Sequence, residues 1–168
     1  MIAPGPSIRP EEPSDRDAIR AVLVQAFGEA AEADLVDRLR SDGDLVLSLV
    51  AVLQGVVGHV AFSRLELSAS PVRAVALAPV AVLPAVQRSG IGTGLVREGL
   101  HGLAASGEDL VLVVGDPAYY RRFGFSPEHA RGLTTPYDGP YLQALAMSEA
   151  GRAASGPVRY GRAFADLG

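Results

Sequence analysis

A loop rich in glycine, Gln87-Arg88-Ser89-Gly90-Ile91-Gly92-Thr93-Gly94, is the strongest candidate in the sequence for binding a ligand. It follows an apolar, strand-like segment, Val72–Leu83, and precedes an apolar pattern with helical spacing. Glycine lets a ligand approach the backbone closely, and the first amides of a helix lack internal partners and carry partial positive charge. The loop therefore predicts an anion site suited to a pyrophosphate, to which Arg88 could add charge.

Glycines at these positions are also compatible with simpler or different loops. A tight turn from strand to helix needs the same glycines, and the loop by itself leaves that possibility open. A Walker-type phosphate loop does not fit, because no Gly-Lys-Ser/Thr follows and the chain contains no lysine. A Rossmann loop fits poorly, because Gly-Ile-Gly-Thr-Gly lacks the final spacing and lies deep in the chain.

The second segment that could do chemistry is aromatic and covers Gly115–Phe125, which reads Gly-Asp-Pro-Ala-Tyr-Tyr-Arg-Arg-Phe-Gly-Phe. Asp116 as N-cap, with proline at the first helical position, predicts a short helix that Gly124 ends. A phenol on this helix could give a proton to a leaving anion. Simple packing of the rings against one another is the alternative, and the segment alone does not decide between them.

The two segments, with a helix and a short strand between them, resemble the GNAT superfamily of N-acetyltransferases. Val82–Gly92 is similar to that family's acetyl-CoA signature, Gln/Arg-x-x-Gly-x-Gly/Ala. The aromatic segment is similar to its Ala-x-x-Tyr-x-x-x-Gly-Phe helix, with Tyr120 at the tyrosine position. The spelling of this helix and the ending Val158-Arg159-Tyr160 look most like the YhbS-like branch of the family.

The resemblance implies an N-acetyltransferase with acetyl-CoA as cosubstrate and an amine as acceptor. Tyr120 would be the catalytic acid that protonates the departing CoA thiolate. We expect direct attack by the amine, because the chain has no cysteine to carry an acyl intermediate. The residues expected to contact the cosubstrate are Val80, Ala81, Val82, Gln87, Arg88, Ser89, Gly90, Ile91, Gly92, Thr93, Asp116, Tyr119 and Arg122.

The group that takes the proton from the amine stays open. The strand Val72–Leu83 has no acid, where many members of the family have a glutamate. Glu66, Glu29, Glu32 and His59 are candidates, and a water relay through backbone carbonyls is equally allowed. The missing acid is also the best support for an alternative function, a catalytically inactive acyl-CoA-binding sensor or partner module. Retention of Tyr120 favours the enzyme.

Composition limits the range of functions. The net charge of −4 and the absence of a basic tract argue against nucleic acid as a partner. His59, His101 and His129 have no metal-ligand spacing, so we expect no metal site. Met1–Pro13 is not a signal peptide, and Val46–Phe62 is too interrupted to span a membrane. We expect a cytoplasmic monomer or homodimer.

The elements that must position these residues fit one domain over 1–168. Pro79 predicts a bulge or splay in its strand. The fold class is α/β (α+β), because helices are interspersed among strands. The resemblance implies a mixed, mostly antiparallel sheet with a splayed central strand and helices on both faces. The other expected strands are three short ones and a hairpin: Ile8–Arg9, Tyr141–Met147, Val158–Phe164, and the hairpin of Leu45–Leu53 with Val56–Leu67. We also expect two helices within Asp15–Leu39. The first has Ser14 as its N-cap and Asp15 in its first turn.

Overall fold

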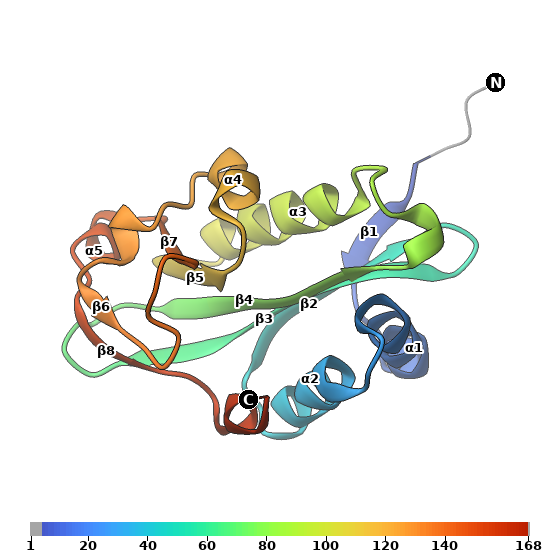
Figure 1. The fold of residues 1–168 in the computed structure, drawn as a ribbon, viewed down its shortest axis with the longest axis horizontal. Helices are drawn as coiled ribbons and strands as arrows, with labels where there is room; N and C mark the ends of the chain where they lie inside the picture. The colour runs from blue at the N-terminus through green and yellow to red at the C-terminus, as the bar shows by residue number, and fades with distance from the viewer. Residues whose placement is uncertain (1–4, 168) are drawn as a thin grey trace.

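The computed structural model describes residues 5–167 and shows one mixed sheet with helices on both faces (Figure 1). Residues 1–4 and 168, which belong to the predicted single domain, lie outside the described residues. The path through the sheet is β1-β2-β3-β4-β5-β7, and along it only β4 and β5 run parallel. The strands are β1 Ser7–Pro10, β2 Leu45–Val52, β3 Val56–Leu67, β4 Ala74–Val82, β5 Leu110–Val114, β6 Leu133–Thr134, β7 Leu142–Ala146 and β8 Gly156–Arg159.

Helices α1 (Arg16–Phe27) and α2 (Ala31–Ser41) cover one face of the sheet, and α3 (Ile91–Ala105) and α4 (Pro117–Tyr120) cover the other (Figure 1). Strands β2 and β3 form the predicted hairpin and send alternate apolar side chains into the two helical layers. α1 ends at Gly28, whose φ of 78° is the left-handed conformation that glycine adopts readily at a helix C-terminus. Within residues 5–167, no helix is long and apolar enough to cross a membrane.

The N-terminal edge differs in detail from the prediction. Ser14 is not a helix N-cap but lies in a 3-10 turn, Pro13–Asp15, that leads directly into α1. Asp15 is buried, and its carboxylate accepts from the Glu12 amide at 2.7 Å and forms an ion pair with Arg9 at 2.6 Å. The acid expected in the first turn of the helix therefore ties the start of α1 to β1.

Strand β4 separates from β5 along its second half. It pairs with β3 from Ala74 to Val82, with a register shift opposite Leu77–Val80. Its pairing with β5 stops after Ala74, Val75 and Ala76. The splay predicted from Pro79 is confirmed, since β4 and β5 separate beyond Ala76. Pro79 itself has no N–H to give to a neighbouring strand. The rest of β4 has an edge that no other described strand covers.

One prediction for the C-terminal segment is wrong. The strand expected over Val158–Phe164 is present only at its start, in β8, and the chain then forms a 3-10 helix, η5, over Arg162–Asp166. Ala163 and Phe164 are buried against Leu35 and Leu39 of α2. A helical turn brings both side chains to that surface, whereas consecutive residues of a strand point to opposite faces.

Candidate functional site

The glycine loop forms a concave row of free backbone amides at the start of α3. Arg88 and Gly90 both have left-handed conformations, with φ of 64° and 86°. Among residues 5–167, no hydrogen bond uses the amide N–H of any residue from Arg88 to Thr93. The next amide, of Gly94, bonds the carbonyl of Gly90 at 2.9 Å and starts the helical pattern. Such a row of amides at the positive end of a 15-residue helix is suited to binding an anion.

Gly92 lies in the first turn of α3, between β4 and α4. A Cβ atom there would lie 3.6 Å from Val82 Cγ2 and 3.9 Å from the Tyr119 hydroxyl, which are ordinary contacts. A methyl group is therefore tolerated, whereas a larger side chain would enter the space between the loop, β4 and α4. That Gly92 leaves room for a ligand stays a prediction.

The uncovered edge of β4 lies beside the loop. The Leu83 amide donates to Val57 on β3, and backbone direction alternates along a strand, so the N–H groups of Val82 and Val80 point away from β3. The side-chain amide of Gln87 already donates to the Val82 carbonyl at 3.0 Å. Ala81 points its backbone toward β3 and buries its side chain under α1, so it is not on this edge.

Helix α4 is tied to the first turn of α3. The Tyr119 hydroxyl and Thr93 Oγ1 are hydrogen-bonded at 3.0 Å. The Arg122 guanidinium lies 4.2 Å from the centre of the Tyr119 ring, and its Nε donates to the Tyr119 carbonyl at 2.8 Å. Asp116 is the N-cap of α4 and accepts from the Ala118 amide at 2.9 Å, as predicted. The structure therefore brings Tyr119 and Arg122 to the glycine loop, and it gives Asp116 a role in holding the helix.

Tyr120 packs on the same face of the sheet as α3. Its ring packs edge-on against Phe125 at 5.8 Å, and the residue is 8% exposed. Burial, with a smaller contribution from Tyr119, raises the pKa of the Tyr120 phenol to about 12. Gly115 makes this packing possible, because a Cβ atom there would lie 2.5 Å from Tyr120 Cε2. The raised pKa keeps the phenol neutral at physiological pH, which is the form that can donate a proton.

Gln143 supports this turn and was missed in the sequence. It is fully buried on β7, and its Nε2 donates to the carbonyls of Gly115 at 3.0 Å and Tyr141 at 3.2 Å. It thereby holds the connection from β5 to α4, on which Tyr120 lies. A single amide side chain in the apolar run Leu142–Ala146 is the signal that could have identified it.

The candidate bases are scattered. His59 is completely buried, with Nε2 2.8 Å from Ser48 Oγ, and burial lowers its pKa to about 4. Glu66 is exposed and forms an ion pair with Arg159. Glu29 is exposed between α1 and α2. Glu32 lies in the first turn of α2, and one of its carboxylate oxygens is buried without a partner among residues 5–167.

The fold and this site define the class of the protein, and the comparisons with known proteins agree. Residues 7–127 match the acetyltransferase (GNAT) domain family. The chain belongs to this family. Over 120 residues it is 43% identical to the uncharacterized N-acetyltransferase YhbS of Escherichia coli, which covers 70% of this chain and 72% of that protein.

Two solved structures extend the similarity to the whole fold. The GNAT family N-acetyltransferase YhbS from Escherichia coli, in complex with CoA, has a TM-score of 0.92 at 36% identity, covering 100% of this chain and 96% of that one. A GNAT family acetyltransferase from Brucella melitensis, in complex with acetyl-CoA, has a TM-score of 0.81 at 38% identity, covering 95% and 97%. The predicted family, its YhbS-like branch and the fold class are confirmed.

Proposed function

We propose that this chain transfers the acetyl group of acetyl-CoA directly to an amine of a small molecule or peptide. The observation that carries the proposal is the row of unbonded amides from Arg88 to Thr93 beside the uncovered edge of β4. These two features match the two parts of CoA, an anionic pyrophosphate and an extended, amide-bearing arm. The related structures that contain CoA and acetyl-CoA support the same cosubstrate here.

Each part of the site has a role in this proposal. The amides of the loop bind the pyrophosphate, with the Arg88 side chain exposed at its rim. Val80 and Val82 offer backbone groups to the pantetheine arm, as an edge strand does to an added strand. Tyr119 and Arg122 lie beside the arm at the first turn of α3. Ala81 and Asp116 act indirectly, through the packing of β4 and the capping of α4.

The chemical step balances with these residues. The lone pair of the amine nitrogen attacks the thioester carbonyl carbon, the carbon–sulfur bond breaks, and an amide forms. The sulfur leaves as a thiolate and takes the proton of the Tyr120 hydroxyl, and the amine loses its own proton to water. Tyr120 then regains a proton from solvent.

An acyl-CoA-binding module without catalysis is the second candidate. The observation that favours it is the sequence of β4, Ala74–Val82, which contains no acid to deprotonate the amine. The cosubstrate site would be the same in both cases, so only turnover separates them.

Calorimetric titration of acetyl-CoA, with NAD and ATP as controls, tests the cosubstrate. Release of free CoA in the presence of amines then tests the reaction. Binding of acetyl-CoA with amine-dependent CoA release is the expected result. Binding without release for every class of amine would favour the inactive module, and no binding of acetyl-CoA would overturn both candidates.

A further inference from the structure

A cavity of about 230 Å³ opens where β4 and β5 separate. Leu77 and Ala78 of β4 and Leu112 to Val114 of β5 form two of its walls. Tyr137, Tyr160 and Phe164 from the C-terminal part of the chain form a third. The cavity therefore begins at the point where β4 stops pairing with β5.

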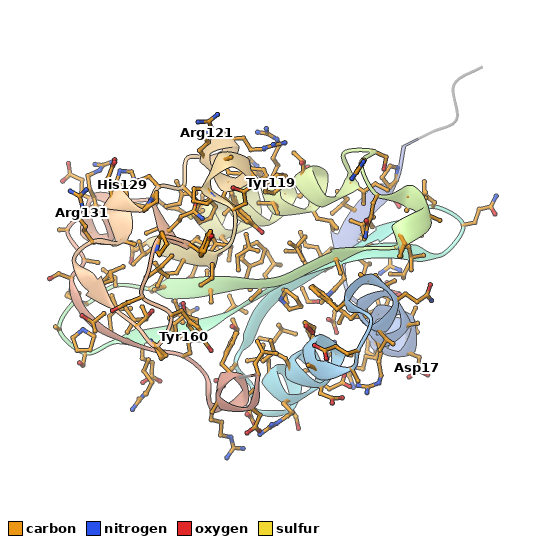
Figure 2. All side chains as sticks on the ribbon, in the orientation of Figure 1. Asp17, Tyr119, Arg121, His129, Arg131 and Tyr160 are labelled. Atoms are coloured by element: carbon orange, nitrogen blue, oxygen red, sulfur yellow. The ribbon has the colours of Figure 1, made fainter. Side chains whose placement is uncertain are left out.

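The cavity lies on the face of the sheet opposite the glycine loop. Ala78, Tyr160 and Phe164 pack with the cluster that includes Leu35 and Leu39 of α2, whereas Tyr119 and Tyr120 pack on the α3 face. Figure 2 shows Tyr119 and Tyr160 on opposite sides of the sheet. An acetyl-CoA arm along the α3 side of β4 leaves this opposite side open for a second substrate to reach the same carbonyl carbon.

The surface of the cavity is apolar and aromatic. Tyr160 meets Tyr137 edge-on at 4.9 Å between ring centres and Phe164 at 5.2 Å. Of residues 5–167, none with a charged side chain lines the cavity. A phenol hydroxyl is the most polar side-chain group that the lining offers, so a ligand that carries a fixed charge into the cavity would lose its hydration without compensation.

We propose that this cavity holds the acceptor, and that the acceptor is a primary amine carried on a single aromatic ring. The inference rests on the proposed acetyl transfer. Aromatic rings pack favourably edge-to-face against other rings, which the wall of Tyr137, Tyr160 and Phe164 provides. A volume of about 230 Å³ lies below the usual range for drug-sized ligands and suits one ring with a short chain.

This assignment also bears on the missing base. An apolar cavity disfavours the ammonium form of an amine, so the acceptor enters it as the neutral nucleophile. A cavity without a carboxylate is then compatible with attack on the thioester. A polyamine or a lysine side chain in a charged peptide would need partners for its charge that these walls do not contain.

An acceptor panel with the wild-type protein tests the proposal. The probes are phenethylamine and aniline, compared with spermidine and Nα-acetyl-lysine amide, and the readout is free CoA released per minute. We expect kcat/KM for phenethylamine or aniline to exceed that for both polar amines by about tenfold or more, since the charged groups of the polar amines would lose their hydration in an apolar site without compensation.

Two variants change the size of the cavity at its rim. Val114→Phe partly fills it and should raise KM for phenethylamine about tenfold while leaving the Kd of acetyl-CoA unchanged. Leu167→Ala enlarges it and should improve the relative kcat/KM of the larger amine tryptamine. Leu53→Phe is the matched control, because Leu53 is 43% exposed in the β2–β3 turn and Val114 is 48% exposed.

The outcomes separate this inference from the proposed function. Preferential turnover of spermidine or the lysine amide, unaffected by Val114→Phe, would overturn the aromatic acceptor and leave acetyl transfer intact. A change in preference among acetyl-, propionyl- and butyryl-CoA, without a change in KM for phenethylamine, would assign the cavity to the acyl chain instead. Acetyl-CoA binding with no acetylation of any amine would overturn the proposed function, and this inference with it.

Discussion

Burial changes the acidity of Tyr120 and His59, the two residues in the sequence best suited to carry a proton, with different consequences. Removal from water favours the uncharged form of each group, so the pKa of Tyr120 rises and that of His59 falls. Tyr120 stays protonated at neutral pH on α4, where its ring packs against Tyr119, and a general acid must be protonated to act. His59 stays neutral but is enclosed between β2 and β4 with Ser48, Glu11 and Arg40, away from that loop.

Replacing Tyr120 by Phe should lower kcat about 10²-fold, since the thiolate loses its proton donor while the ring still fills its place. The Kd of acetyl-CoA should change little. The measurement is steady-state turnover with calorimetric binding, and Tyr141→Phe at a 60% exposed position is the control. Wild-type kcat in Tyr120→Phe would show that another group protonates the thiolate.

His59 should make the folded state sensitive to mild acid. Its unfolded pKa is near 6.5 and its folded pKa is about 4, so the unfolded chain takes up a proton first as pH falls. The stability from neutral His59 is complete above pH 6.5 and is lost as pH falls toward 4. Between pH 7 and 5 the free energy of unfolding should drop by about 2 kcal/mol from this group.

Urea titrations at pH 7 and pH 5 measure this loss. His59→Leu should reduce the loss of unfolding free energy between pH 7 and pH 5 by about 2 kcal/mol, because the contribution of His59 is gone. The part of the loss that comes from carboxylates should remain. His101→Gln, at an exposed position of α3, should keep the wild-type dependence. An unchanged pH dependence in His59→Leu would mean that His59 is not held neutral in the folded protein.

At the scale of elements, the start of α3 and the splay of β4 create the site together. The loop supplies unbonded amides because Arg88 and Gly90 turn the chain into left-handed conformations. The splay supplies backbone groups of β4 without strand partners, because β4 pairs with β5 only as far as Ala76. α4 closes the arrangement through Tyr119 and Thr93. Neither element alone has both features that the proposed cosubstrate requires.

Gly92→Leu should raise the Kd of acetyl-CoA about tenfold or more, a loss of about 1.4 kcal/mol or more. The leucine side chain would occupy the space between the loop, Val82 and Tyr119. Gly92→Ala is the matched control, because its Cβ makes only ordinary contacts and binding should stay near wild type. Calorimetry on both variants gives the result. Equal affinity in Gly92→Leu and wild type would contradict the placement of the ligand.

At the scale of the whole molecule, one sheet joins both halves of the chain. Strand β5 and the antiparallel β7 extend the sheet that β1 to β4 begin, and helices from both ends of the sequence pack on it. We therefore expect residues 1–168 to behave as a single domain with one cooperative unfolding transition.

Differential scanning calorimetry tests this expectation. A single transition should appear, and acetyl-CoA at about 100 times its Kd should raise Tm by roughly 5–10 °C, since ligand binding adds about 2.7 kcal/mol to the folded state. NAD should leave Tm unchanged. Two transitions, with only one shifted by acetyl-CoA, would show that the chain contains two independent units.

The sequence alone predicted the local parts of this protein. The glycine loop, the capped aromatic helix, the β2–β3 hairpin and the splay at Pro79 are set by conformational preferences over a few residues, so each could be found without contacts. The order of these motifs also identified the family. Two local predictions were wrong. Ser14 was misassigned because Asp15 pairs with Arg9, and the end of β8 was misassigned because Phe164 packs against α2, which lies far away in the sequence.

Only the tertiary structure decided which residues meet. It buried Ala81 away from the open edge of β4 that Val80 and Val82 share. It placed Gln143 so that its side chain donates to the Gly115 carbonyl, and it buried His59. It also gathered Tyr137, Tyr160 and Phe164 at the separation of β4 and β5. Such sites depend on contacts between segments far apart in the chain, and these contacts follow from packing and burial, which spacing along the sequence does not specify.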